Sequence, residues 1–227
     1  MINQLIRYEP ALRFMEMAGH QRLCEVGSGQ NGICKFLDQD VTGIDIDFRD
    51  YQSGSGTDFH PRLTPVFGDI LKGTNFADGE FDVVLCVDML EHVAKADRPR
   101  AIKEILRMSK RAYIALPVGA RALAADRWLD EVLRRIGRVP PAWLREHFDA
   151  GFPVDGEIEH ILDSMPQFEY DAFDNDNILF HKFVVFLEIV RFAHLSDRIS
   201  RWKIARPLMR LFNGGDAYRR VYLVTRR

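Results

Sequence analysis

The chain has 227 residues, of which 47% are hydrophobic and 28% charged, with a formal net charge of −2. This composition is typical of an ordinary soluble globular protein, long enough for one domain with a full core. The three cysteines, Cys24, Cys34 and Cys86, lie in apolar segments without CxxC spacing, which excludes a disulfide framework or a zinc site and indicates free thiols. The N-terminus carries no visible secretory signal, so we expect a cytoplasmic protein.

The first 150 residues alternate strand and helix patterns, which predicts an α/β fold with a largely parallel sheet. After a helix over 8–18, strands are expected over 23–26, 41–46, 66–67, 81–86 and 112–116. Helices are expected at 31–37 and 100–108, and a helix or a turn at 89–93. The segment 50–61 is too rich in Gly and Ser for regular structure.

The second half of the chain is less regular. An amphipathic helix is expected over 121–136, a loop region with short helical turns over 138–166, a strand over 168–173, an apolar helix over 178–195 and a last strand over about 221–225. Together with the first half, this predicts a doubly wound, mostly parallel, seven-stranded Rossmann-like sheet with helices on both faces and a helical C-terminal elaboration. We assign 1–120 to a Rossmann-like core and 121–227 to an elaboration that completes the same domain.

A glycine-rich turn follows the first strand. It runs from Glu25 through Gly27, Ser28 and Gly29, and the next strand ends in a carboxylate, Asp45, 18 residues after Gly27. Glycines let the backbone approach a ligand closely, and a carboxylate at this place accepts hydrogen bonds from both hydroxyls of a ribose. The arrangement predicts a pocket for a nucleoside.

Two further strand ends carry carboxylates. The third strand leads to Asp69, and the fourth runs into Asp88. In an open α/β sheet these ends converge on one edge, where ligands bind. There Asp69 can accept a proton from the exocyclic amine of adenine, while Ile46, Ile70 and Met89 can enclose the ring.

With FDVV at 81–84 and LEHV at 90–93, the sequence resembles the class I S-adenosylmethionine-dependent methyltransferases over about 22–118. The resemblance implies S-adenosylmethionine as the cofactor and methyl transfer, with O-methylation favoured, as the reaction. It assigns the methionine part of the cofactor to Glu25, Gly27 and Gly29, the ribose to Asp45, and the adenine side to Asp69. It also places Cys86, Val87 and Asp88 along the methionine side.

The glycine turn departs from the family's frequent pattern, because Asn31 stands where a third glycine is common and Gly32 follows one step later. The literal string is therefore GxGxxG, the dinucleotide form, and an NAD(P)-dependent oxidoreductase or epimerase is the alternative enzyme. Glu25 would repel a pyrophosphate, however, and no Tyr-x-x-x-Lys pair follows the sheet. A cofactor-binding partner subunit without catalysis is the alternative outside enzymes.

Two histidines are the candidate catalytic residues, because a hydroxyl acceptor must lose a proton. His92 begins a helix or turn near the expected methyl position, and His147 lies in a segment able to fold over the acceptor. The run Glu157-x-Glu159-His160 is the nearest approach to metal-ligand spacing, and it is too thin to predict a site. We therefore expect a metal-independent enzyme.

The acceptor is a small molecule, a lipid-linked compound or a glycan; the many aromatic residues of the second half favour an apolar one. From Arg191 the chain carries ten Lys or Arg and two Asp, and this basic end suggests an anionic partner. Peripheral membrane contact would use Arg198, Arg201, Lys203, Arg206 and Arg210, and absence of binding to anionic vesicles at low salt would remove the idea. The segment 178–195 is core, a homodimer contact or a lipid contact. No pattern predicts nucleic-acid binding.

Overall fold

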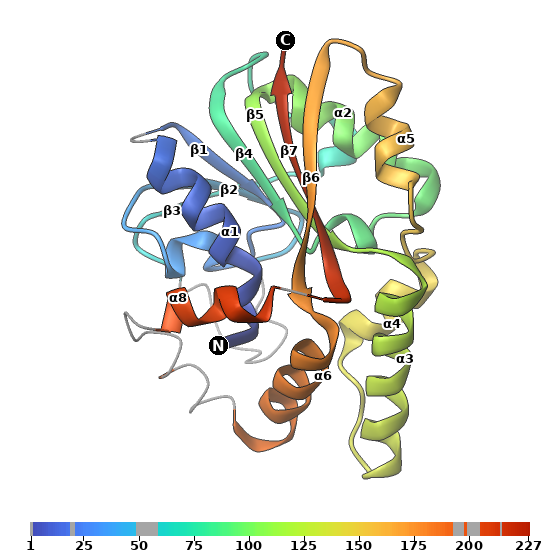
Figure 1. The fold of residues 1–227 in the computed structure, drawn as a ribbon. Helices are drawn as coiled ribbons and strands as arrows, with labels where there is room; N and C mark the ends of the chain where they lie inside the picture. Colours follow the sequence, from blue (N-terminus) through green and yellow to red (C-terminus); the bar gives the residue numbers. More distant parts are fainter. Residues whose placement is uncertain (1, 19–20, 49–58, 193–197, 199–204, 214) are drawn as a thin grey trace.

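The computed structural model describes residues 2–18, 21–48, 59–192, 198, 205–213 and 215–227. These residues form a seven-stranded sheet in the order β3-β2-β1-β4-β5-β7-β6 (Figure 1). The strands are β1 Leu23–Val26, β2 Val41–Asp45, β3 Leu63–Phe67, β4 Phe81–Val87, β5 Ser109–Pro117, β6 Phe168–Asn177 and β7 Ala217–Arg226. Only β7 runs antiparallel to its neighbours β5 and β6, so the predicted mostly parallel fold is confirmed.

The order of the strands reverses between β1 and β4. β2 follows β1 on one side, and β4 pairs with β1 on the other, Leu23 lying opposite Val41 and Val83. At such a reversal the connections leave toward opposite faces and open a crevice at the carboxyl ends of the strands. The glycine turn after β1 and the segment after β4 both border this crevice.

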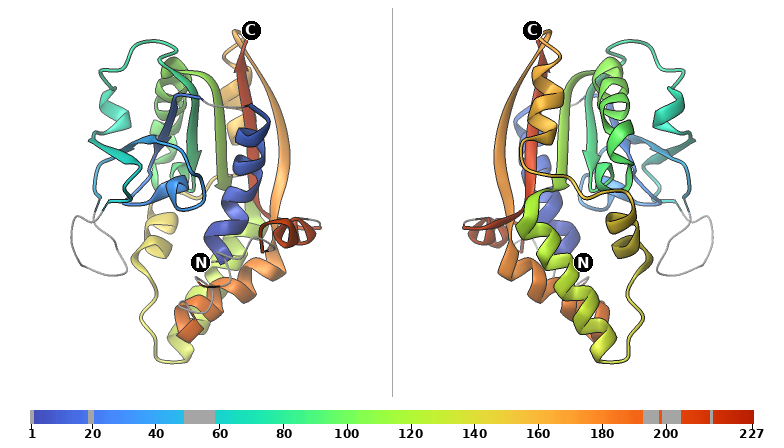
Figure 2. Two further views of the ribbon diagram at one scale, coloured as in Figure 1. Left: turned by 90° about the vertical axis from the view of Figure 1, so that its left-hand side faces the viewer. Right: turned by 90° about the vertical axis from the view of Figure 1, so that its right-hand side faces the viewer.

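Helices cover the two faces of the sheet (Figure 2). One face carries α1 (Ile2–Ala18) and α8 (Ala205–Met209), and the other carries α2 (Arg98–Met108) and α5 (Glu157–Asp163). β4 faces both layers, because its side chains alternate: Val84 and Cys86 pack toward α2, while Val83, Leu85 and Val87 pack toward α1.

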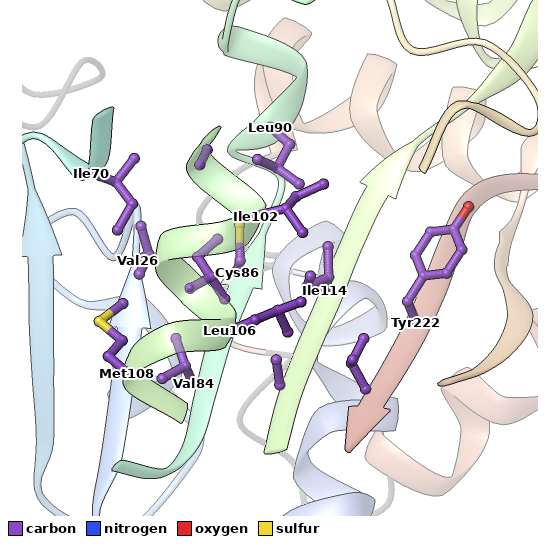
Figure 3. Packing of buried hydrophobic residues seen from close by; sticks show 14 of the residues in the cluster. Val26, Ile70, Val84, Cys86, Leu90, Ile102, Leu106, Met108, Ile114 and Tyr222 are labelled. Carbon is purple, nitrogen blue, oxygen red and sulfur yellow. The ribbon is translucent and has the colours of Figure 1, made fainter. Parts of the chain in front are cut away.

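The α2 layer of the core is shown in Figure 3, where Ile102 and Leu106 of the helix lie over Cys86 and Ile114 of the sheet. All four side chains are buried to within 1% of full burial. Removing such a side chain from water stabilises the fold by about 2 kcal/mol. This packing therefore fixes the positions of the central strands, whose carboxyl ends border the crevice.

Three helices gather at the carboxyl end of the parallel strands (Figure 1): α3 (Gly119–Arg135), α4 (Ala142–Asp149) and α6 (Ile178–Leu187). They share a small core of their own, made by Leu129 and Leu133 of α3, Leu144 of α4 and Val185 of α6. The predicted core role of 178–195 thus holds for one side of α6. On its other side Leu179 and Phe183 are exposed, so a homodimer contact or a lipid contact stays a prediction.

The first helix begins at Ile2, six residues before the predicted start. It continues through Pro10, which has no N–H to donate to the carbonyl of Ile6. The side chain of Asn175, in β6, donates to that carbonyl instead, at 3.2 Å. A contact between residues far apart in sequence therefore makes this proline tolerable inside the helix.

Several other elements differ from expectation. The predicted helix at 31–37 is only a short 3-10 turn, Gly32–Lys35, because the positive φ of Gly29 and Gly32 and the short connection to β2 leave no room for a full helix. The helix or turn expected at 89–93 is a 3-10 turn, Leu90–His92. The predicted loop region 138–166 contains α4 and α5, which begin after Pro141 and Gly156. The helix expected over 178–195 ends at Leu187 and continues as a π-helical turn, Glu188–Phe192.

Some predictions fall on residues outside the described ranges, namely most of the loop 50–61, the end of 178–195, and Arg201 and Lys203. Peripheral membrane contact stays a prediction. Among the described residues, no helix is both long enough and apolar enough to span a bilayer.

Candidate cofactor and acceptor sites

The glycine turn after β1 has the backbone that its sequence requires. Gly27 has φ +77°, and a Cβ there would lie 2.7 Å from Cγ of Met89. Gly29 has φ +53°, and nothing lies within 4 Å of the position its Cβ would take. The backbone of the turn therefore packs against Met89 at Gly27, and at Gly29 it leaves space that a ligand can enter.

Glu25 is fully buried beneath this turn. Tyr8 Oη of α1 donates to Glu25 Oε1 at 2.6 Å, and the N–H of Ile33 donates to Glu25 Oε2 at 2.7 Å. Burial raises the pKa of this carboxyl to about 7, although the two hydrogen bonds oppose the shift. With both oxygens engaged by protein groups, Glu25 fixes the shape of the turn and the position of α1.

Asp45 ends β2 beside the turn. Its carboxylate accepts the N–H of Gly29 at 2.9 Å and the N–H of Asp47 at 3.1 Å. Ser28, 6% exposed, donates to the carbonyl of Gly29 at 3.0 Å. The carboxylate is therefore oriented at the open side of the turn, and each of its oxygens still has lone pairs for a ligand.

The adenine side predicted from the sequence lies at the ends of β2 and β3. Ile46 and Phe67 are 72% and 70% exposed there, while Ile70 is 7% exposed. Asp69 accepts the N–H of Leu71 at 2.9 Å and so begins the short 3-10 helix at Ile70–Lys72. Exposed apolar side chains beside a carboxylate suit a flat ring with an exocyclic amine.

The three site residues predicted at the end of β4 differ in their surroundings: two belong to the core and one does not. Cys86 and Val87 are 0% and 3% exposed, and their side chains belong to the core on opposite faces of the sheet. Burial raises the pKa of the Cys86 thiol well above its usual range. These two residues can meet a cofactor through their backbone, whereas Asp88 leaves the sheet.

Asp88 is locked by two arginines from distant elements. Arg219 Nε of β7 donates to Asp88 Oδ1 at 2.7 Å, Arg219 Nη2 donates to Asp88 Oδ2 at 2.6 Å, and Arg7 Nη1 of α1 donates to Oδ2 at 2.9 Å. Burial alone would raise the pKa of this carboxyl, but the two guanidinium groups hold it well below its usual range. Asp88 has φ +50°, a strained conformation for a residue with a side chain.

A second buried aspartate continues the network. Arg219 Nη1 donates to Asp176 Oδ2, which His181 of α6 also contacts through Nδ1 at 2.8 Å. Asp176 has φ +68° and is 0% exposed. One arginine thus joins the end of β4, the end of β6 and the start of α6.

Beyond Asp88 lies a cavity of about 520 Å³. We call it the acceptor cavity. It is lined by α1, the segment after β4, α4, α6 and β7. Its lining residues include Arg7, Asp88, Glu91, His92, Trp143, His147, His181, Tyr218 and Arg219. The two candidate catalytic histidines, 55 positions apart in the chain, thus come together, with ring centroids 4.7 Å apart.

Each of these histidines is oriented by a carboxylate. His147 Nδ1 lies 2.8 Å from Asp126 Oδ2 of α3, and Tyr218 Oη donates to Asp126 Oδ1 at 2.8 Å. His92 Nδ1 lies 2.8 Å from Glu146 Oε2 of α4. Burial and the neighbouring His147 lower the pKa of His92. Burial opposes protonation of His147 too, but Asp126 and Glu91 outweigh it and raise its pKa.

Glu91 completes the group. It is 1% exposed, its Oε1 lies 3.8 Å from Nε2 of His147, and its Oε2 has no hydrogen-bond partner within the described part of the chain. Burial and the charge of Asp88 raise the pKa of Glu91. Glu157 and Glu159, the other pair considered from the sequence, instead contact Arg98 and Arg220.

Sequence reasoning missed most of the walls of the acceptor cavity. Glu91 stands beside His92 in the LEHV string, and that adjacency was the available signal. Asp126, Asp176, Arg219 and Tyr218 lie in ordinary helix or strand patterns, and nothing in the local sequence distinguishes them.

The sheet order, the glycine turn and the carboxylate at the end of β2 define an α/β protein that binds a nucleoside cofactor at a strand-order reversal. A family model described as a methyltransferase domain matches residues 24–114. The match covers less than half of the chain, and over those residues it agrees with the class I S-adenosylmethionine-dependent methyltransferase family that the sequence resembles.

Solved structures with the same fold are distant in sequence. The plantazolicin methyltransferase BpumL, in complex with a triazolic desmethyl analogue and S-adenosylhomocysteine, is 14% identical, with a TM-score of 0.59, and the alignment covers 100% of this chain and 86% of that one. Magnesium protoporphyrin IX methyltransferase from Synechocystis PCC 6803, with bound S-adenosylhomocysteine, is 15% identical, with a TM-score of 0.59 and coverages of 100% and 84%.

The [4+2]-cyclase SpnF is 18% identical, with a TM-score of 0.53 and coverages of 92% and 75%. A comparison with curated proteins found no match. At these identities the likeness shows the fold alone, and the chemistry at the acceptor must be argued from this chain's own residues.

Proposed function

We propose that this protein transfers a methyl group from S-adenosylmethionine to a hydroxyl of a small-molecule or lipid-linked acceptor held in the acceptor cavity. The observation that carries the proposal is the position of Asp88. This residue directly follows β4 at the strand-order reversal and also lines the acceptor cavity. A cofactor bound along the glycine turn would therefore have its reactive end beside the cavity.

The cofactor's contacts follow the order of the strand ends. We propose that the backbone of Gly27, Ser28 and Gly29 contacts the methionine part and that Asp45 binds the ribose hydroxyls. Ile46, Asp69, Ile70 and Met89 would enclose adenine. Cys86 and Val87 would contribute backbone, and Glu25 would support the turn from below. The carboxylates Asp45 and Asp69 suit a cofactor that carries positive charge and no phosphate.

Methyl transfer is an in-line displacement at carbon. The acceptor oxygen forms a new C–O bond to the methyl carbon while the bond from that carbon to sulfur breaks. The electron pair of the broken C–S bond stays on sulfur, which gives S-adenosylhomocysteine. Much of the rate comes from holding the two reactants in line while water is excluded. His92 and His147 are the proposed catalytic residues, because both line the cavity beside Asp88 and both are oriented by carboxylates.

The division of the chain follows from this arrangement, with one refinement. We propose that residues 1–120 form the cofactor-binding core and that 121–227 build the acceptor side of the same domain. Asn3, Gln4 and Arg7 nevertheless line the acceptor cavity from α1. The first helix therefore serves the acceptor side as well.

The acceptor belongs to a broad class. BpumL and the enzyme from Synechocystis are described as methyltransferases of plantazolicin and of magnesium protoporphyrin IX. The cavity here combines an aromatic wall, Trp143 and Tyr218, with the charged pair Arg7 and Arg219. It suits an acceptor that has an apolar ring or chain and a polar group near Asp88.

The test is binding of S-adenosylhomocysteine by calorimetry to the wild type and to Asp45→Ala. Loss of the ribose contacts should weaken binding well over tenfold. Asp45→Asn keeps the shape and one acceptor oxygen and should lose less. Asp40→Ala removes a carboxylate at the opposite end of β2, where its side chain is 84% exposed, and should bind as the wild type does. Unchanged affinity in Asp45→Ala, or preferential binding of NAD(H), would refute the proposal.

A further inference from the structure

Glu91, His92 and His147 each offer a ligand atom to one small volume in the wall of the acceptor cavity, and those three atoms lie within 4.8 Å of one another. Oxygen or nitrogen ligands of one transition-metal ion lie about 2.0–2.2 Å from it, and so about 3.4 Å apart when tetrahedral. The 3.8 Å between His147 Nε2 and Glu91 Oε1 is close to that spacing. His92 has room to close the remainder, because its side chain is 29% exposed in a short turn.

The surroundings of the two histidines are those of metal ligands. A ligating histidine commonly has its second ring nitrogen held by a carboxylate, which fixes the ring and its tautomer. Here Asp126 holds Nδ1 of His147, and Glu146 holds Nδ1 of His92, each at 2.8 Å. In both rings Nε2 is the nitrogen left for a ligand.

The charges at the group also favour a cation. Among the described residues, the ion pairs of Glu91, Asp126 and Glu146 are all with the two histidines. The nearby arginines, Arg7 and Arg219, are bound to Asp88 and Asp176 instead.

The unpartnered oxygen of Glu91 is an independent observation. Glu91 is 99% buried, and its Oε2 has no hydrogen-bond partner among the described residues. A buried carboxylate oxygen left without a partner loses its hydration and gains nothing in return, which destabilises the fold. Coordination of a cation removes that cost.

We propose that Glu91, His92 and His147 bind a divalent transition-metal cation such as Zn²⁺ or Co²⁺, and that the acceptor's oxygen occupies one of its open positions. Two imidazoles and one carboxylate select such ions over Mg²⁺ or Ca²⁺, which prefer oxygen ligands. The proposal rests on the proposed function and refines it, because it gives the two histidines the role of ligands. It also replaces the expectation of a metal-independent enzyme.

The chemistry that the ion supplies is acidification of a coordinated hydroxyl. The acceptor's proton passes to water, and its oxygen then attacks the methyl carbon as described above. The substrate class is accordingly a phenol, an alcohol or a hydroxyl beside a second oxygen ligand. Glu91, His92 and His147 orient that oxygen toward the end of β4, where Asp88 lies.

The experiment is a Co²⁺ titration of the full chain after treatment with a chelator and its removal, followed by visible absorption, with Zn²⁺ binding measured by calorimetry. The wild type should bind one equivalent of each ion. Glu91→Gln, which keeps the shape of the side chain, and His92→Ala, which truncates a partly exposed side chain, should each weaken binding about 100-fold or more. Glu146→Gln, which only releases His92, should cost about tenfold.

His160→Ala is the matched control, because His160 is an exposed histidine of α5 outside the group. It should bind Co²⁺ as the wild type does. If the wild type binds neither ion, or if Glu91→Gln and His92→Ala bind as tightly as His160→Ala, the proposal is overturned. Exclusive binding of Mg²⁺ would overturn it as well.

Binding of S-adenosylhomocysteine separates the two proposals and reports folding of each variant. A chain that binds S-adenosylhomocysteine but neither ion keeps the proposed function and loses the metal site. A chain that binds Co²⁺ through Glu91 and His92 but no S-adenosylhomocysteine keeps the site and loses the proposed function.

Discussion

The two halves of the binding crevice are built differently. On the cofactor side, the groups come from consecutive strand ends, and backbone N–H groups of Gly29, Ile33 and Leu71 hold the carboxylates. On the acceptor side, the groups come from the whole length of the chain, from Arg7 to Arg219, and charged side chains hold one another. The cofactor side is thus a local backbone structure, and the acceptor cavity is a tertiary assembly.

The difference has an energetic consequence. A carboxylate held by backbone N–H groups needs only its own turn to be correct. A buried carboxylate held by an arginine from another element depends on that element's position, and loss of the arginine leaves the charge unpaired. Substitutions should therefore act locally on the cofactor side and globally on the acceptor side.

The largest effect should come from Arg219→Met. This change leaves Asp88 and Asp176 buried without the guanidinium that joins them, so unfolding in urea should show a loss of about 3–5 kcal/mol. The neighbouring Arg220→Met is the control, because Arg220 is 38% exposed and pairs with the exposed Asp174. It should cost less than about 1 kcal/mol. Equal losses in the two variants would contradict the role given to the buried ion pairs of the acceptor side.

Glu25 should give the cofactor side a pH dependence. Its pKa is raised from 4.5 to about 7 in the fold, so between these values the native state binds more protons than the unfolded state. The free energy of unfolding contributed by Glu25 is therefore full below pH 4.5 and falls as pH rises through 7, by up to about 3 kcal/mol.

Glu25→Gln lacks this titration. The difference in unfolding free energy between wild type and variant, measured in urea from pH 5 to pH 8 without cofactor, should move steadily against the wild type. A difference that stays constant with pH would show that Glu25 is ionised in the native state at every pH tested.

The smallest effect should be the difference between two glycine-to-alanine substitutions at positive φ, one in contact with a neighbouring side chain and one without such a contact. Gly27→Ala places a Cβ against Met89 at a positive φ, whereas Gly137, with φ +72°, has nothing within 4 Å. Gly137→Ala should cost about 1 kcal/mol for the backbone. Gly27→Ala should cost about 2 kcal/mol more, because Met89 must move, and should also weaken binding of S-adenosylhomocysteine. Equal unfolding free energies would refute the contact.

Much of the fold was predictable, because the strands carry apolar runs and end in recognisable turns. The apolar run at 81–86 identified the central strand. The helix predicted at 31–37 is only a four-residue 3-10 turn, because apolar spacing does not show how few residues remain between the glycine turn and β2. Short helical turns were expected within 138–166, but the bounds of α4 and α5 were not predicted, since prolines and glycines that flank a short helix look like loop residues.

The parts of the candidate site that could be predicted are those made by residues close together in the sequence. The glycine turn, Asp45 and Asp69 follow strands in order, so their positions at one edge could be inferred. Glu25 also belongs to that motif, but only the structure shows that Tyr8 and the N–H of Ile33 engage both of its oxygens.

By itself the sequence determined the sheet, the glycine turn with its neighbouring carboxylates, and the resemblance to methyltransferases, because each depends on short runs of residues with their own periodicity and turns. The tertiary structure alone decided the acceptor cavity. Glu91 and His92 meet His147, and Arg219 joins Asp88 to Asp176, only when α4, α6 and β7 pack against the end of β4. Contacts of this kind join residues far apart in sequence and depend on how helices and strands pack, so they cannot be predicted from a short run of residues.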